Sequence, residues 1–196
     1  HQPYYKDPLT GEFSLPWVRL HGIKDYLDML EILHGFPQLH QTFNLVPSLI
    51  EQLDEYAKNG LETKDEFLIL SKKDARALSA DEQDFILMNF FMANWEHMVR
   101  PFPRYYDLLE KRGVIEEVSE LSSVRKYFSN QDYLDLQVLF NLAWFDPVYQ
   151  EKDKDLKELI QKGSYFNEED KEAVLNKQFE IMAEIIPAYK RFQEKG

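Results

Sequence analysis

Apolar residues recur at steps of three and four along the first part of the chain. The positions that share this spacing are Leu20, Ile23, Leu27 and Leu30. Residues spaced in this way lie on one face of an α-helix. Ser14 can cap the N-terminus of this helix, and Pro16 suits its first turn. The helix is predicted to end near His34, since Gly35 and Pro37 follow.

The segment 39–46 (LHQTFNLV) has the pattern that most favours a β-strand, being short, apolar at several positions and carrying β-branched Thr42. A second helix is predicted to begin at Pro47 and to end at residues 59–60 (Asn-Gly). A helix, a strand and a further helix in this order are typical of βαβ connections. We therefore expect a first strand immediately before His1. That would place His1 at the carboxyl end of a strand, where barrel folds carry their active sites.

From residue 61 onward the pattern becomes helical. Ser79 and Glu82 have the spacing of a capping box ahead of an apolar stretch. Predicted helical segments cover residues 65–70, 80–98, 103–112, 114–128, 130–145, 153–162 and 168 onward. Pro187 is expected to kink the last of these helices. The pattern as a whole predicts an α/β fold that is mostly helical, with one or two short parallel strands.

Composition and charge narrow the classes of function. Hydrophobic residues make up 44% of the chain and charged residues 30%, which favours a packed core over disorder. The net charge of -12 disfavours binding to nucleic acid and to anionic membrane surfaces. The absence of cysteine removes disulfides and thiolate metal sites. Since no apolar run approaches the ~20 residues that span a bilayer, we expect no membrane segment and a cytoplasmic protein.

The first residues of the chain are the strongest candidates for a binding site. His1 and Gln2 can both form hydrogen bonds with neutral hydroxyl groups, and Tyr4 and Tyr5 offer flat faces on which a sugar ring can stack. An exposed His-Gln pair can also be incidental. We take His1 and Gln2 as predicted substrate-binding residues.

Further candidates lie near the first helix and at the end of the predicted strand. Trp17, Arg19 and His21 lie at the start of the first helix, and Trp17 and Arg19 are predicted substrate-binding residues. Arg19 and His21 could point toward the mouth of a barrel, although an arginine on a solvated helix face is an equal alternative. Asn44 is either a cap for the following helix or a ligand contact. His40 is interpreted as a structural histidine inside the strand. Asp146 is interpreted first as a residue that ends a helix and begins a turn.

Common catalytic motifs do not occur in the chain. It has no HExxH pair, no Gly-rich phosphate loop and no GxSxG sequence. Acidic residues are plentiful, but they fall at helix starts or on polar faces, and none stands out as a catalytic pair. The sequence therefore names no catalytic residue, no metal ligand and no cofactor.

Three stretches in order carry a family resemblance: HQPYYKDPLTGEFSLPWVRLHGIKDYLDML, HQTFNLVPSLIEQL and LFNLAWFDP. They resemble the N-terminal part of glycoside hydrolase family 57, in the branch with α-amylase-like and amylopullulanase-like enzymes. The resemblance implies a (β/α)7 barrel, with residues 1–60 as its first part and 61–196 as a helical insert of the same catalytic domain. It also implies that His1 helps to bind the sugar at the point of cleavage.

The same resemblance implies an enzyme that hydrolyses or transfers α-glucans with retention, through a Glu nucleophile and an Asp acid/base. Such chemistry needs two carboxyl groups roughly 5 Å apart. The family carries them on later strands, and neither motif is found in this chain. We therefore expect a fragment that holds part of the site for an α-glucan or maltooligosaccharide and is inactive by itself.

Two alternatives remain open. The chain could be a non-catalytic helical module for carbohydrate binding or a scaffold, because helices dominate after residue 61. It could also belong to a metal-dependent enzyme on a related barrel, with His1 as a ligand. The lack of a second nearby His or of an Asp-x-Asp sequence argues against a metal site.

Overall fold

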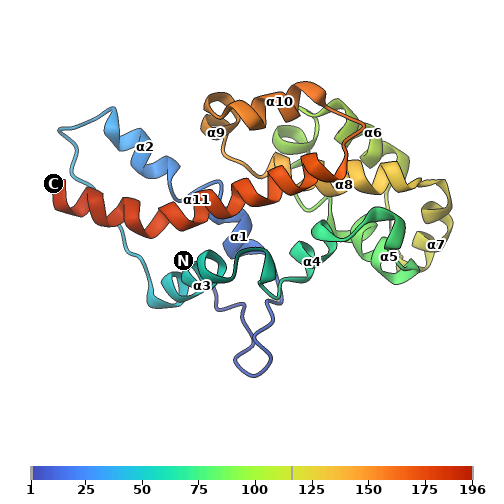
Figure 1. Ribbon diagram of the computed structural model, residues 1–196, viewed down its shortest axis with the longest axis horizontal. Coiled ribbons are helices and arrows are strands. Elements are labelled where there is room, and N and C mark those ends of the chain that lie inside the picture. Colours follow the sequence, from blue (N-terminus) through green and yellow to red (C-terminus); the bar gives the residue numbers. More distant parts are fainter. Residues whose placement is uncertain (1, 116, 196) are drawn as a thin grey trace. The chain divides into compact units, whose positions relative to one another are not determined.

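The computed structural model describes residues 2–115 and 117–195 and consists of helices joined by turns (Figure 1). The α-helices are α1 (Trp17–Gly22), α2 (Asp28–His34), α3 (Pro47–Asn59), α4 (Glu66–Lys72), α5 (Ala80–Asn89), α6 (Pro103–Arg112), α7 (Leu121–Val124), α8 (Asn130–Ala143), α9 (Pro147–Lys152), α10 (Lys154–Lys162) and α11 (Glu168–Lys195). Short 3₁₀ turns lie at Gly60–Glu62, Ala75–Ala77, Val118–Glu120 and Arg125–Tyr127, and a π-helical turn at Trp95–Val99.

The predicted α/β fold class is wrong, because the described residues form an all-α structure without any β-strand. Only two isolated bridges occur among them, between Lys6 and Phe13 and between Phe13 and Asp65. Neither the parallel strands nor a barrel is therefore seen. The reason is visible in segment 39–46, which has no neighbouring strand within the described residues. A strand forms only when a second strand satisfies its backbone groups.

The chain divides into two compact units, which are described separately. The first unit comprises residues 1–69, 145–149 and 175–196, and the second comprises residues 70–144 and 150–174. These bounds differ from the predicted division of the chain at residue 60. That division refers to parts of one catalytic domain, and it stays a prediction.

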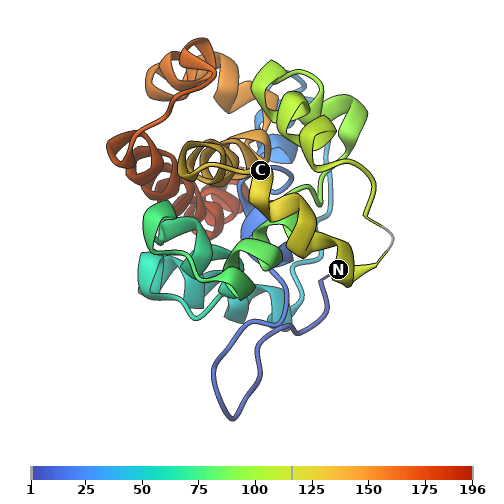
Figure 2. The same ribbon diagram turned by 90° about the vertical axis from the view of Figure 1, so that its right-hand side faces the viewer.

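In the first unit, α1 packs against α3. The apolar face predicted for the first helix is indeed buried, but it is shared between α1 and α2, which are separated by a turn. The buried side chains include Val18, Leu20, Ile23, Leu53, Tyr56 and Ile185. Residues 6–13 form a loop, closed by the bridge between Lys6 and Phe13, that extends away from the helices (Figures 1 and 2).

In the second unit, α8 is the central helix. Its residues from Asp135 to Ala143 are all buried, and α5 and α6 pack against it. A helix that is buried on nearly every side is surrounded by other elements. Its buried Asp135 carboxylate accepts hydrogen bonds from the Arg104 Nε (2.8 Å) and from the Phe166 backbone N–H (3.0 Å).

Helix ends follow the sequence signals closely. Ser79 and Glu82 form the predicted capping box of α5, and Ser129 and Asp132 form a second one at α8. The helix predicted over 103–112 is confirmed as α6. Local capping chemistry therefore sets these boundaries.

Candidate functional site

The predicted site residues that the structure describes, Gln2, Trp17, Arg19 and Asn44, do not meet in one cavity. His1 lies outside the described residues. Gln2 is half-buried, and its Oε1 accepts a hydrogen bond from the Tyr5 hydroxyl (3.3 Å). Trp17 is half-buried, with its ring centroid 6.1 Å from that of His21, and Asn44 is exposed.

Arg19 lies inside the first unit, on the buried face of α1. Its side chain and that of Asp65 are both 0% exposed. The guanidinium Nε donates to Asp65 Oδ2 (2.9 Å), and Nη1 donates to Gln178 Oε1 (2.7 Å). Tyr56 donates its hydroxyl to the same Asp65 oxygen (3.1 Å). This network joins α1, α3 and α11 in the interior, so Arg19 lies neither at an open mouth nor on a solvated face.

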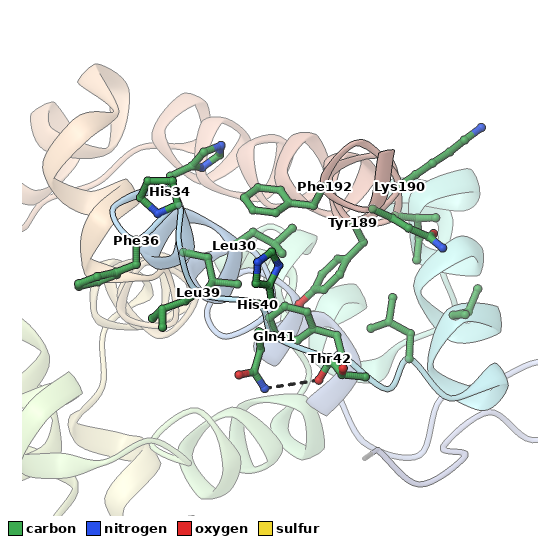
Figure 3. Close-up of a pocket in the computed structure, with 17 residues that line it drawn as sticks. Leu30, His34, Phe36, Leu39, His40, Gln41, Thr42, Tyr189, Lys190 and Phe192 are labelled. Atoms are coloured by element: carbon green, nitrogen blue, oxygen red, sulfur yellow. Dashed lines mark hydrogen bonds between the residues drawn. The ribbon is translucent and has the colours of Figure 1, made fainter. Parts of the chain in front are cut away.

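A cavity of about 850 Å³ lies elsewhere in the first unit. Its walls come from α2, the connecting segment 36–45, the side chain of Ile50 on α3 and the last turns of α11 (Figure 3). We call it the α2–α11 groove. Its size lies within the range of cavities of ~300–1,000 Å³ that bind small organic ligands.

Aromatic rings line much of the groove. Phe43 and Tyr189 make an edge-to-face contact with ring centroids 5.3 Å apart, and His34 and Phe192 make another at 4.6 Å. The Tyr189 hydroxyl donates to the Tyr26 carbonyl (2.8 Å), which fixes its ring in place. Burial, the Asp28 charge and Tyr26 raise the pKa of Tyr189 to about 12, so this hydroxyl stays protonated at neutral pH.

The polar groups of the groove are neutral or basic. They are His34, His40, Gln41, Thr42, Lys190 and Gln193, and the described lining contains no Asp or Glu. His40 lies at the centre of Figure 3 between Leu30 and Tyr189, whereas the Lys190 ammonium points away from the cavity. Gln41 donates to the Thr42 carbonyl (3.4 Å). The groove thus offers amide, hydroxyl and imidazole groups beside ring faces.

Sequence reasoning did not find this groove. The sequence predicts a strand at 39–46 and a structural role for His40. In the structure, the His40 side chain is exposed and lines the cavity. Tyr189 and Phe192 look like ordinary residues of a long helix. No local signal marks them, because only packing of α11 beside segment 36–45 brings them together.

Three carboxylates gather near α2, outside the groove lining. Burial raises the pKa of Asp28, and the nearby charges of Asp146 and Asp25 raise it further. Burial also raises the pKa of Asp146, whose Oδ1 accepts a hydrogen bond from the Val148 N–H (2.7 Å). In Asp25, hydrogen bonds from His21 and Lys24 outweigh burial and lower the pKa.

Among residues 2–115 and 117–195, no group of three or more His, Cys, Asp or Glu side chains could hold a metal ion. None of the described helices is both long enough and apolar enough to cross a membrane.

A family model described as glycosyl hydrolase family 57 matches residues 1–196. No curated protein and no solved structure matches the chain. The family match supports the context of a glycoside hydrolase or glucanotransferase that acts on carbohydrate. Because the match extends over all the residues of the sequence, this chain belongs to glycosyl hydrolase family 57.

Proposed function

We propose that this chain forms part of the carbohydrate-binding surface of a retaining α-glucan hydrolase or 4-α-glucanotransferase. The observation that carries the proposal is the α2–α11 groove in a chain of this family, lined by aromatic rings and by neutral hydrogen-bonding groups. Flat ring faces suit the C–H faces of a pyranose, and a few convergent polar groups suit its hydroxyls.

The catalytic carboxyls are proposed to lie outside this chain. Retention needs two carboxyl groups ~5 Å apart on either side of the scissile bond. The described lining of the groove contains none. The chain is therefore proposed to bind glucan without cleaving it, and the enzyme is proposed to gain its acid and nucleophile from other segments.

The residues predicted from the sequence take different roles in this proposal. His1, Gln2, Trp17 and Asn44 are proposed to contact sugar separately from the groove, since the three that are described keep exposed surface but do not line it. Arg19 is fully buried. Its proposed role is to position α1 by binding Asp65, without direct contact with substrate.

Binding of maltoheptaose to the 196-residue chain tests the groove. Phe36→Ala removes an exposed ring of the lining (56% exposed) and is expected to weaken binding about tenfold, the effect of losing ~1.4 kcal/mol of contact. Tyr127→Ala, which removes an exposed ring of the second unit (73% exposed), should leave the affinity unchanged. Isothermal titration calorimetry measures both. Absence of maltoheptaose binding by the parent chain contradicts the proposal.

The second candidate is the non-catalytic helical carbohydrate-binding module, which the all-α fold favours. The two are separated with the product of the complete gene. An enzyme should release reducing ends from starch, and His1→Ala should lower that rate. Glucan binding without any cleavage supports the module, whereas unchanged cleavage removes His1 from the site.

A further inference from the structure

In the second unit, Trp95 is the exposed end of a series of packed side chains. The rings of Tyr105 and Phe91 stack with their centroids 5.4 Å apart. The Arg112 guanidinium lies over the Phe91 ring at 4.8 Å and over the Trp95 ring at 5.9 Å. Tyr105, Phe91 and Arg112 are buried, whereas Trp95 is 47% exposed. An indole ring that rests on the interior is therefore open to solvent.

The orientation of this indole is fixed. Its Nε1 donates to the Phe91 carbonyl (3.0 Å). The Arg112 side chain beside it is held as well, because Nη1 donates to the Leu87 carbonyl (3.3 Å) and Nε to the Gly113 carbonyl (3.0 Å). A ring already held by the protein loses little freedom when a ligand covers it, which lowers the cost of binding.

The backbone that carries Trp95 is irregular. Trp95–Val99 is a π-helical turn, in which the Arg100 N–H donates to the Trp95 carbonyl five residues earlier (2.9 Å). Asn94 caps this turn, and its Oδ1 accepts from the His97 N–H (3.0 Å). Single π-helical turns are rare and occur frequently at functional sites.

The residues that flank the ring on this turn are polar. Asn94, Glu96 and His97 are exposed, and Glu96 pairs with Arg100 (3.2 Å). An amide and an imidazole can form hydrogen bonds with sugar hydroxyls, and an indole face suits the C–H face of a pyranose. A protein partner would need a broad apolar patch instead of one ring among polar groups. The local chemistry therefore favours a carbohydrate.

We propose that Asn94, Trp95 and His97 form a second carbohydrate-binding site, which we call the Trp95 site. It lies in the second unit, whereas the α2–α11 groove lies in the first. Membership of a family that acts on carbohydrate identifies the class of ligand. The choice of α-glucan within this class rests on the proposed function. An insoluble glucan presents many chains, so a second site strengthens attachment to it.

NMR of the ¹⁵N-labelled 196-residue chain tests the site directly. The chain has three tryptophans and therefore three indole N–H signals. The signal that disappears in Trp95→Phe belongs to Trp95. Titration with maltoheptaose is expected to shift this signal and to leave in place that of Trp144, which is 6% exposed. The shift should persist in Phe36→Ala, because Phe36 belongs to the groove.

Sedimentation with insoluble amylose measures the contribution to binding of a polymer. Trp95→Ala is expected to weaken this binding about tenfold, because one of two attachment sites is lost. Trp95→Phe keeps a ring and should lose less. Tyr127→Ala is the matched control, since it removes an exposed ring of the same unit whose hydroxyl makes no hydrogen bond among the described residues, and it should bind as the parent does.

The outcomes separate this inference from the proposed function. A Trp95 signal that maltoheptaose does not move overturns the inference, and the groove then stands or falls by its own calorimetric test. A shift that vanishes in Phe36→Ala is indirect and also overturns it. A Trp95 signal that moves with protein concentration instead of ligand overturns it in favour of contact between copies of the chain. A persistent Trp95 shift in a chain whose affinity for maltoheptaose is unchanged by Phe36→Ala supports the Trp95 site and contradicts the groove.

Discussion

Arg19 shows how a single residue can serve the fold where a binding role had been expected. Its charge is fully buried, and it is held by Asp65 and Gln178. Burying a charge is costly unless it is paired and hydrogen-bonded, and removal of one partner leaves the other uncompensated. An exposed ion pair carries no such penalty, because water solvates both partners.

We predict that Arg19→Met lowers the free energy of unfolding by about 3–5 kcal/mol, because the Asp65 carboxylate remains buried without its partner. The matched control is Arg76→Met, which removes the arginine of the exposed Asp74–Arg76 pair and should cost less than about 1 kcal/mol. Urea unfolding monitored by circular dichroism measures both. Equal losses in the two variants would show that the Arg19 network does not stabilise the first unit.

The helices α5, α8 and α10 begin at residues whose side chains replace the missing backbone acceptors. At α8 the Ser129 Oγ accepts from the Asp132 N–H (3.2 Å), and Asp132 Oδ2 accepts from the Ser129 N–H (2.6 Å). This reciprocal pair satisfies two donors of the first turn. Since α8 is the centre of the second unit, its first turn supports the packing of α5 and α6 as well.

At this scale we predict that Ser129→Ala lowers the free energy of unfolding by about 1 kcal/mol. Ser122→Ala is the control, because Ser122 is an exposed serine of α7 whose hydroxyl contacts only the Ser119 carbonyl. It should change stability by less than about 0.5 kcal/mol. Thermal and urea unfolding compare the two variants, and a Ser129→Ala loss no larger than that of Ser122→Ala refutes the role of the cap.

Segment 39–46 marks the limit of prediction at the scale of elements. Its apolar and β-branched residues are those of a strand, and its backbone is not helical. Among the described residues, its backbone hydrogen bonds are local. The Leu39 N–H donates to the Phe36 carbonyl (2.9 Å), the Thr42 carbonyl accepts from the Gln41 side chain (3.4 Å), and the Val46 carbonyl accepts from the N–H groups of the first turn of α3. Strand propensity depends on the residues of one segment, whereas a sheet forms only between two segments. The pairing could not be read from the segment itself.

Across the whole molecule, acidification changes stability in two opposing ways. Burial would raise the pKa of Asp132, but hydrogen bonds from Lys111, Ser129 and Arg104 lower it to about 2. This carboxylate therefore stabilises the fold above its unfolded pKa near 4, and the stabilisation is lost as the pH falls from ~4 to ~2. Asp146 acts in the opposite sense, because burial raises its pKa and its protonation on acidification relieves an unfavourable charge.

The chain passes its isoelectric point near pH 4.9, and below that pH the protonation of carboxylates leaves the positive charges of its Lys, Arg and His side chains in excess, so that repulsion within the molecule grows as the pH falls. A loss of stability between pH 4 and 2 therefore includes this general repulsion, and the contribution of the Asp132 carboxylate is the difference between a variant and the parent protein. We predict that Asp132→Asn lowers the free energy of unfolding at pH 7 by about 2 kcal/mol and flattens its decline between pH 4 and 2.

Asp107→Asn, at an exposed position of α6, is the matched control and should keep the slope of the parent protein. Urea unfolding at a series of pH values measures all three proteins. An unchanged slope between pH 4 and 2 in Asp132→Asn would assign the acid sensitivity to other carboxylates.

The sequence by itself determined the family and the positions of most helices. Its ordered motifs are extended stretches, and helix caps and stops act within a few residues, so both can be read locally. α3, α6 and the capping box at Ser79 lie where the sequence places them.

The tertiary structure alone decided the fold class, the burial of Arg19 and the assembly of the α2–α11 groove. Each depends on residues far apart in the chain: Arg19 on Asp65 and Gln178, and Phe43 on Tyr189. The physical reason is that a local pattern specifies which face of an element is apolar, whereas the element that covers this face is chosen by packing.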